Sequence, residues 1–233
     1  MDNQPKTVTP RTVILLLIFI VVVPFLPLLI SRQWDWWEAW VYAAICILGF
    51  AISRALAARH HPDLLAERAR FLQQADAKSW DKVLSPLVGL GGGLIPLVAG
   101  LDAAFDWTAY VFSPPAKIIA LVIILAGYVL GSCVLIENRF FSGMVRLQTD
   151  RGHYVVTSGP YRWIRHPGYA GALLTYLVTP IFLDSIWTFL PVLFITVVLV
   201  IRTNLEDHFL QEELTGYREY ATKVRFRLLP GVW

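Results

Sequence analysis

The sequence predicts an all-α polytopic membrane protein with about six transmembrane helices and a C-terminal amphipathic cytoplasmic helix. The chain has 233 residues, of which 56% are hydrophobic and only 16% are charged. An average soluble domain carries roughly 25% charged residues, and it needs them to cover its surface. Long uncharged runs divide the sequence. These observations exclude a soluble globular protein and place much of the chain in a bilayer.

The uncharged runs give the expected transmembrane spans in order. The first run, residues 12–31, lacks charge over the ~20 residues that a helix needs to cross the hydrocarbon core. The later spans are expected at residues 39–53, 83–101, 118–136, 169–183 and 185–201. A signal peptide is the alternative for the first run. Its length, its two prolines and the lack of a small-residue cleavage site after it favour a membrane span.

The placement of lysine and arginine predicts the orientation of these spans. With both termini cytoplasmic, 18 of the 20 basic residues fall in cytoplasmic segments, and only Arg32 and Lys117 fall outside them. This asymmetry is what the positive-inside rule describes. The net charge of +3 therefore reflects loops close to anionic membrane lipid. No basic block with interleaved aromatic residues indicates a nucleic-acid surface.

We expect a single membrane domain over residues 1–233, without repeats or long linkers. Residues 1–136 supply the N-terminal transmembrane helices. Between the second and third spans lies a polar interfacial segment, residues 54–82, which contains the sequence PDLLAERARFL. The helical spacing and mixed charge of that sequence are typical of a helix at the cytoplasmic interface.

No metal site is expected from the histidines and cysteines. His60 and His61 have no third ligand at useful spacing, so an interfacial solvated pair is favoured. Cys46 and Cys133 fall inside predicted spans and have no partner at metal-ligand or disulfide spacing. We interpret both cysteines as small apolar core residues.

A glycine-rich run, GLGGGLIPLVAG at residues 89–100, has two readings. A glycine loop that binds a nucleotide follows a strand, opens a helix and needs an acidic residue for the ribose. Here the run lies inside an apolar span. Gly89 and Gly93 stand four residues apart, which favours close helix packing or a kink.

The segment GPYRWIRHPGYAG, residues 159–171, is the most unusual polar stretch of the chain. Basic anchors with an aromatic belt are one explanation of it. That explanation leaves out two X-Pro steps, Gly159-Pro160 and His166-Pro167, which force the backbone to be extended just before a helix begins. The first N–H groups of such a helix are free to bind a ligand. We therefore expect a polar cradle for an anionic or zwitterionic small molecule.

The tail after the last span supplies a second polar group. Arg202 begins it, and Glu206 follows four residues later on the same helical face. An apolar stripe is expected on that helix, formed by Leu205, Phe209, Leu210, Leu214 and Tyr217. By itself the tail is better explained by a simple ion pair on an amphipathic helix.

Taken together, GPYRWIRHPGYAG, about thirty apolar residues, RTNLED and then GYREYATKVRFRLLPGVW resemble the isoprenylcysteine carboxyl methyltransferase family of integral membrane enzymes. The RHPxY signature is shared more loosely with phospholipid methyltransferases, and less with the membrane sterol reductases, which bind NADPH. The resemblance is closest over residues 137–233. It implies a cofactor-binding methyltransferase core in that region, with S-adenosylmethionine as the cofactor and a lipophilic or lipidated acceptor as the partner.

The resemblance also implies roles for individual residues. Arg202 matches the arginine that is placed to hold the acceptor carboxylate, so it is the expected catalytic and substrate-binding residue. The residues expected to bind the cofactor are Gln148, His153, Tyr154, Val155, Val156, Tyr161, His166, Pro167, Gly168, Tyr169 and Glu206. Where the family often has two adjacent glutamates, this chain has Glu206 and Asp207.

Three functions remain open at this point. In carboxyl methylation the nucleophile is already ionised at neutral pH, so alignment and exclusion of water suffice and Arg202 can grip the carboxylate. Methylation of a lipid amine is the alternative, and it needs a base to deprotonate the amine, for which His153 or His208 would serve. A non-catalytic membrane scaffold is the third function.

Overall fold

The structure, a computed structural model, describes residues 17–70, 74 and 76–233, and in these ranges it contains helices and no strand. The elements in chain order are η1 (Ile18–Val22), η2 (Val23–Phe25), α2 (Leu26–Ser31), α3 (Trp37–His60), α4 (Pro62–Ala69), α5 (Asp81–Phe105), α6 (Pro114–Glu137), η4 (Thr149–Arg151), η5 (Gly159–Arg162), α7 (Pro167–Phe182), α8 (Phe189–Glu213) and α9 (Tyr217–Lys223). The all-α fold class is confirmed for the described residues.

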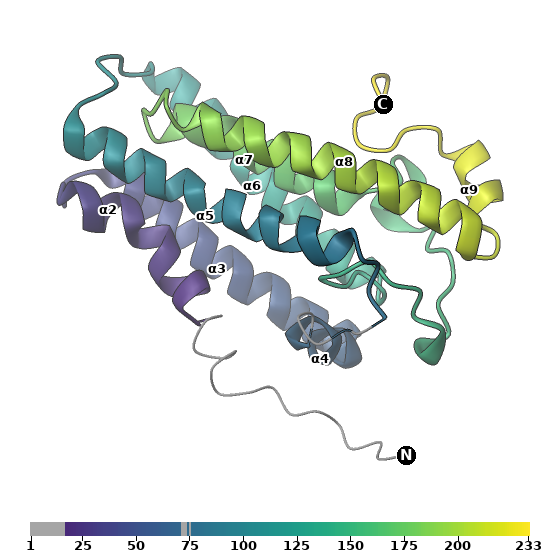
Figure 1. Cartoon of the computed structure of the whole chain (residues 1–233). Helices are drawn as coiled ribbons and strands as arrows, with labels where there is room; N and C mark the ends of the chain where they lie inside the picture. The colour runs from purple at the N-terminus through teal and green to yellow at the C-terminus, as the bar shows by residue number, and fades with distance from the viewer. Residues whose placement is uncertain (1–16, 71–73, 75) are drawn as a thin grey trace.

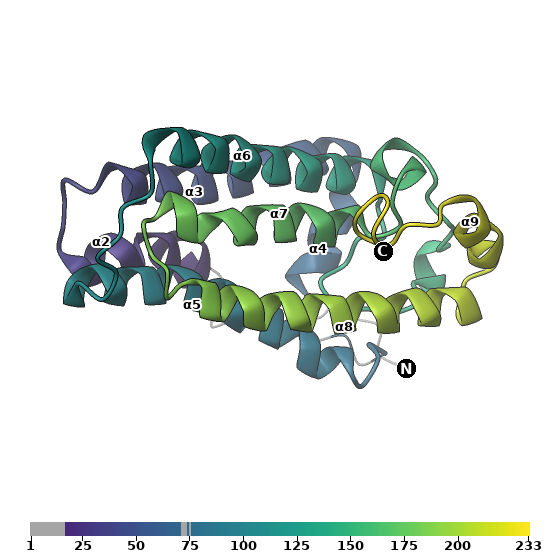
Figure 2. The ribbon, with the colours of Figure 1, turned by 90° about the horizontal axis from the view of Figure 1, so that it is seen from above.

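The long helices lie side by side along one axis, as Figures 1 and 2 show from two directions. The connections that follow α2, α5 and α7 lie at one end of this bundle. The other end, which we call the α9 end, carries α4, α9 and the C-terminal residues. Within the bundle α7 packs mainly on α6, and α5 packs on α2 and α8.

Among the described residues, four helices are long and apolar enough to cross a membrane, namely α3, α5, α6 and α8. The stretch Ile18–Ser31 lies where the first span was expected, and α7 lies where the fifth was expected. Both are shorter than the four helices of spanning length. Residues 12–16 of the first expected span lie outside the described residues. The structure thus supports four spans, and six crossings stay a prediction.

The last span does not end where hydropathy placed its end. α8 continues through Arg202 to Glu213, so the expected cytoplasmic helix is the end of α8. The chain leaves the helix at Leu214, and Gly216 has a φ of 84°, which is open to glycine at little cost. Tyr217 then begins α9. The expectation that the apolar stripe from Leu205 to Tyr217 lies on one helix was therefore wrong.

The glycine run lies inside α5, and no strand precedes it in the described chain. A Cβ atom on Gly91 would lie 2.9 Å from Cβ of Ile195 on α8, whereas one on Gly89 would meet nothing within 4 Å. Close helix packing is therefore the role of this run. The tight contacts are made by Gly91 and by Gly100, which lies equally close to α2, whereas Gly93 makes only an ordinary contact with Phe19 and Gly89 makes none.

The end opposite α9 is held by buried polar contacts. Lys117 pairs with Glu38 at 2.5 Å and also with Asp184. Asp102 accepts hydrogen bonds from the hydroxyl groups of Thr108 and Ser185. These contacts join α3, α5, α6 and the connection between α7 and α8. This end of the bundle is closed, which leaves the α9 end as the place for a site.

Candidate active site

A cavity of about 760 Å³ lies at the α9 end of the molecule. Its wall includes every residue that the sequence singled out for the site except Pro167. These residues are Gln148, His153, Tyr154, Val155, Val156, Tyr161, His166, Gly168, Tyr169, Arg202 and Glu206. Pro167 is buried as the first residue of α7, so its role is to start the helix.

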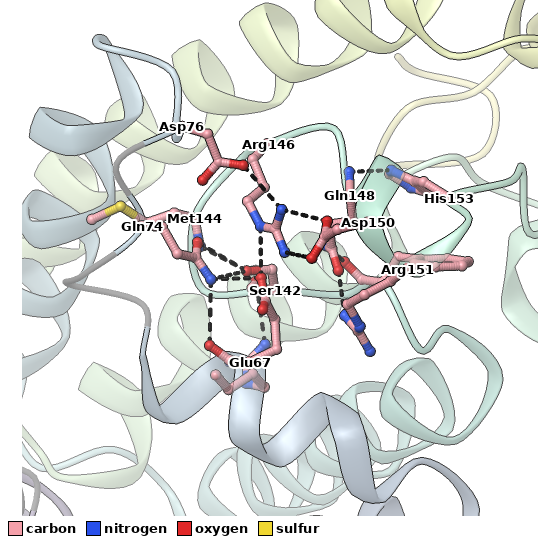
Figure 3. A network of polar contacts seen from close by, with 12 residues as sticks. Glu67, Gln74, Asp76, Ser142, Met144, Arg146, Gln148, Asp150, Arg151 and His153 are labelled. Carbon is pink, nitrogen blue, oxygen red and sulfur yellow. Dashed lines mark hydrogen bonds and ion pairs between the residues drawn. The ribbon is translucent and has the colours of Figure 1, made fainter. Parts of the chain in front are cut away.

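The loop between α6 and α7 forms one wall of the cavity, and Arg146 holds this loop to α4. Arg146 is buried, and its Nε donates to Glu67 at 2.8 Å. Its terminal nitrogens donate to Asp76 at 3.0 Å and to Asp150 at 2.9 Å (Figure 3). Gln74 donates to the same Glu67 carboxylate at 2.6 Å. The loop is therefore fixed by charged hydrogen bonds although it has little regular structure.

Gln148 stabilises this loop through hydrogen bonds to other residues of the loop. Its side chain is buried, its amide nitrogen donates to the carbonyl of Phe140 at 2.7 Å, and its amide oxygen accepts from Arg151. Arg151 also donates to Asp63 at 2.6 Å. The amide of Gln148 is thus hydrogen-bonded to other protein groups, and its contribution to the cavity is to fix the shape of the wall.

His153 lies on the cavity wall as a neutral ring. Its Nδ1 accepts a hydrogen bond from the backbone N–H of Gln148 at 3.3 Å, so this nitrogen carries no proton. Burial, together with the positive charges of Arg146 and Arg151, lowers the pKa of His153 to about 4. At neutral pH the ring is uncharged and has little tendency to take a proton.

The extended segment that follows His153 offers free backbone groups to the cavity. In the described chain, the backbone N–H and C=O groups of residues 154–157 make no hydrogen bond to other protein groups. Tyr154, Val155 and Val156 line the cavity, and Val156 is buried. Backbone polar groups at a partly buried position need a partner, so this segment can bind a ligand through its main chain.

Asp207 joins the RHPxY segment to the C-terminal part of the chain. Its buried carboxylate accepts hydrogen bonds from Arg165 at 3.0 Å and Arg227 at 2.9 Å, and it lies 3.2 Å from Nε2 of His166. Tyr217 donates to it as well, at 3.1 Å. Arg165 was a candidate membrane anchor in the sequence, but it is buried against Asp207.

The backbone strengthens the same connection. The N–H groups of Arg165 and His166 donate to the carbonyls of Phe226 and Arg227, both at 2.9 Å. The hydroxyl of Tyr220 donates to the carbonyl of Tyr161 at 2.7 Å. The tail therefore closes over the turn that precedes α7 and fixes the direction in which that helix starts.

Glu206 meets the RHPxY segment inside the cavity. The hydroxyl of Tyr169 donates to Oε2 of Glu206 at 2.5 Å, and both side chains line the cavity. The ring of Tyr169 is stacked on that of His166, with an interplanar angle of 4°. The two motifs that were only adjacent in a pattern, around residues 159–171 and 202–207, are thus in direct contact.

Arg202 is held differently from what was expected. Its Nε and Nη2 donate to the two carboxylate oxygens of buried Asp81 at 2.7 and 2.9 Å, and Nη2 also donates to the carbonyl of Gly143. No hydrogen bond joins it to Glu206. Asp81 therefore occupies the pair of donors that was expected to bind an acceptor carboxylate. The other terminal nitrogen of Arg202, Nη1, has no hydrogen-bond partner among the described residues.

Comparison with known proteins agrees with this geometry. Residues 118–212 match the model of the isoprenylcysteine carboxyl methyltransferase family. Over this region the chain is similar to the isoprenylcysteine carboxyl methyltransferase family. The match covers α6, the loop, α7 and most of α8, and so it includes every expected site residue.

Three relatives show how far the similarity extends. A rice protein (Oryza sativa subsp. japonica) named "Probable protein-S-isoprenylcysteine O-methyltransferase" is 31% identical over 114 residues, which cover 46% of this chain and 57% of the rice protein. Protein-S-isoprenylcysteine O-methyltransferase B of Arabidopsis thaliana is 29% identical over 110 residues, which cover 44% of this chain and 53% of that protein. A delta(14)-sterol reductase of Mus musculus is 28% identical over 131 residues, 52% of this chain and 31% of the reductase. The chain spans about half the length of the plant relatives.

Sequence reasoning missed two residues of the site and underrated a third. Asp81 was taken as part of a polar interfacial segment, and Arg165 was considered only as one of the basic anchors in the explanation that was not favoured. Asp207 was noticed only as a departure from the family pattern. A useful signal was available for Asp81, because an acidic residue at the edge of an apolar span is costly unless it has a partner, and Arg202 is at the matching edge of another span.

Proposed function

We propose that this protein is an integral membrane methyltransferase that transfers the methyl group of S-adenosylmethionine to a carboxylate on a lipophilic acceptor. The proposal rests on one observation above all. The two motifs of the matched region come together in a single cavity, where Tyr169 donates to Glu206 at 2.5 Å. A scaffold protein would have no need for this converging set of polar groups.

The cavity fits a cofactor of this kind. The carboxylate of Glu206, several aromatic rings and a stretch of free backbone groups line it, which suits a zwitterion joined to a flat heterocycle. Glu206 would bind the amino group of the cofactor. The main chain of residues 154–157, with the rings of Tyr154 and Tyr161, would hold the rest.

The remaining expected residues support this binding. His166 and Gly168 place the start of α7 against the cavity, and His166 is fixed by Asp207. Gln148 and His153 shape the opposite wall. Pro167 begins the helix on which Tyr169 lies. These residues would position the groups that bind the cofactor. Such roles agree with a reaction whose rate depends on the alignment of donor and acceptor.

When bound, S-adenosylmethionine supplies an electrophilic methyl group that a carboxylate oxygen can attack while the sulfur leaves as a neutral thioether. The carboxylate is ionised at neutral pH, so the protein does not have to remove a proton. What the chain contributes is orientation and a dry surrounding. Arg202, held in place by Asp81, can donate from Nη1 to one oxygen of the acceptor.

Amine methylation, the alternative function, lacks a suitable base. His208 is exposed and does not line the cavity. His153 does line it, but its pKa is lowered to about 4, and a base works best when its pKa is near the operating pH. Of the two reactions, this site therefore favours carboxyl methylation.

We further propose six crossings, with both termini and the α9 end on the cytoplasmic side. Four helices of spanning length, the two shorter apolar helices that lie with them, and the 18 basic residues in the segments assigned to this side support the arrangement. The N-terminal part of this proposal concerns residues 1–16, which lie outside the described residues.

The direct test is a binding and transfer experiment on the purified full chain in detergent. Calorimetric titration should show that S-adenosylmethionine binds, whereas NADPH, the cofactor expected of a sterol reductase, does not. With radiolabelled S-adenosylmethionine and host membranes, label should appear in a base-labile ester. Label in a lipid headgroup would point to amine methylation, and binding of NADPH alone would remove the proposal.

Glu206→Gln tests the cavity within this experiment. The variant should bind S-adenosylmethionine at least about tenfold more weakly, because a hydrogen bond to a charged group is lost. Glu213→Gln is the matched control, since Glu213 is an exposed glutamate at the end of the same helix. Equal affinity in the two variants would mean that the cofactor binds elsewhere.

A further inference from the structure

A second cavity of about 1280 Å³ lies among α3, α5, α6 and α7, inside the apolar part of the bundle. Its wall is aromatic and glycine-rich, with members such as Tyr42, Gly92, Tyr128, Gly131 and Tyr176. Phe141 and Gly168 line this cavity and the first one. The two cavities are therefore neighbours, and the residues at their junction belong to both.

The ring of Phe141 forms the wall at this junction. A Cβ atom on Gly168 would lie 2.5 Å from the ring of Phe141, so the ring rests directly on the glycine. The guanidinium of Arg68 lies over the same ring, 5.2 Å from its centre. The ring of Phe141 therefore stands where the linings of the two cavities meet.

Two arginines line the second cavity, Arg54 on α3 and Arg68 on α4. Arg68 donates to the carbonyls of Phe141 at 2.7 Å and Ser142 at 3.3 Å, and the guanidinium of Arg54 lies 4.6 Å from the centre of the Phe50 ring. Neither is within ion-pair distance of a described acidic side chain. Within residues 17–70, 74 and 76–233, both cations are thus held without a counter-charge.

This lack of a partner sets Arg54 and Arg68 apart from the other arginines that line the two cavities. Arg146, Arg165 and Arg202 each pair with a carboxylate. Burial, together with the positive charges of Arg54 and Arg202, lowers the pKa of Arg68 to about 9. A cation in such surroundings is costly unless an anion neutralises it.

The position of Arg68 is fixed by the polar network of Figure 3. Glu67, its neighbour on α4, receives hydrogen bonds from Arg146 and Gln74. These bonds hold α4 against the loop that carries Phe141. The guanidinium of Arg68 is therefore held at the junction by a helix that is itself fixed in place, as a binding residue requires.

We infer that Arg54 and Arg68 bind the carboxylate of the methyl acceptor, whose apolar chain lies in the second cavity. The inference rests on the proposed function. Guanidinium groups match a carboxylate in charge and shape, and the junction puts that carboxylate next to the methyl-donor cavity. Arg202 then adds a contact from the other side through Nη1. Methylation makes the acceptor neutral, so the product loses these charged contacts and can leave.

The test uses the full chain in detergent with N-acetyl-S-farnesylcysteine as the acceptor. Arg54→Gln and Arg68→Gln should each raise the acceptor KM at least about tenfold and leave the S-adenosylmethionine affinity unchanged. Arg59→Gln, which changes an exposed arginine further along α3, is the control and should behave like the unaltered protein. The donor affinity also reports whether each variant is folded.

A second measurement needs no variant. The unaltered protein should be inhibited at least about tenfold more strongly by a non-reactive farnesyl carboxylate than by the matching carboxamide. Equal inhibition, or an unchanged acceptor KM in both glutamine variants of an active enzyme, overturns the inference. So does a result in which the variants lose only their stabilisation by anionic phospholipid, which would make these arginines lipid-headgroup anchors. Absence of donor binding in the unaltered protein would instead refute the proposed function.

Discussion

Asp81 sets the position of Arg202 and of the loop beside it. Its carboxylate, which is fully buried, receives two hydrogen bonds from Arg202 and one from the backbone N–H of Val145 at 2.6 Å. Two helices and the loop therefore meet on one side chain. A change at this residue affects Arg202, the proposed catalytic group, which lies far away in the sequence.

We expect Asp81→Asn to weaken both folding and catalysis. Breaking one side of a buried ion pair costs about 3–5 kcal/mol, because the remaining charge stays buried without a partner. The unfolding temperature in detergent should fall, and turnover should fall further because Arg202 loses its orientation. Asp106→Asn is the control, since Asp106 is exposed at the end of the same helix. A stable variant with normal turnover would contradict this role of Asp81.

Arg202→Lys probes the same contact from the other partner. A lysine keeps the charge but cannot reach both oxygens of Asp81 in a planar fork. We expect turnover to fall on the order of 100-fold, as for a misplacement of about 1 Å, while the affinity for S-adenosylmethionine changes little. Single-turnover rates and calorimetry separate these effects. A near-normal rate would remove Arg202 from the catalytic role.

His153 gives a prediction for the dependence on pH. Its pKa in the folded protein is lowered to about 4, below its value of about 6.5 in an unfolded chain. The unfolded chain therefore binds more protons between these values, and the free energy of unfolding rises with pH across this window and is unaffected by His153 above it. Thermal unfolding of the unaltered protein and of His153→Gln should show this dependence in the former only.

At the scale of elements, the packing of α5 on α8 depends on one glycine of the glycine-rich run. Gly91→Ala would place a Cβ atom 2.9 Å from Cβ of Ile195. Such overpacking lowers the free energy of unfolding by about 1–3 kcal/mol. Gly89→Ala meets nothing within 4 Å and should be neutral or stabilising by up to about 1 kcal/mol. Unfolding temperatures of the two variants in the same detergent compare them directly.

Four of the six expected spans are helices of spanning length, and the helix ends were predicted less well. Apolar runs locate the part of a helix that lies in lipid, but α3 continues past residue 53 through Arg54 and Arg59, and α8 continues past residue 201. Charged residues lower the mean hydropathy and so end the predicted span, but they do not end the helix. In the same way the pattern around residues 159–171 located half of the cavity. The contact of Arg202 with Asp81 could not be predicted from local periodicity, because the two residues are 121 apart; the signal for it was the position of each charge at the edge of an apolar span.

At the scale of the whole molecule, the proposed orientation can be tested by cysteine labelling. In a background that lacks Cys46 and Cys133, a cysteine at Glu213 should react with a membrane-impermeant reagent only from the cytoplasmic side. A cysteine at Tyr110, in the exposed connection between α5 and α6, should react only from the other side. Labelling of both positions from one side would rule out the six-span arrangement.

The contact between Arg202 and Asp81 also has a consequence for the order of synthesis. The donor cavity needs α5, the loop after α6, and the residues up to Arg227 that bind Asp207. A nascent chain emerges from its N-terminal side, so α5 and the loop after α6 are made before Arg202, Asp207 and Arg227. The second cavity, whose lining ends at Tyr176 on α7, can therefore assemble first, whereas the proposed methyl-donor cavity is completed only when Arg227 has left the ribosome.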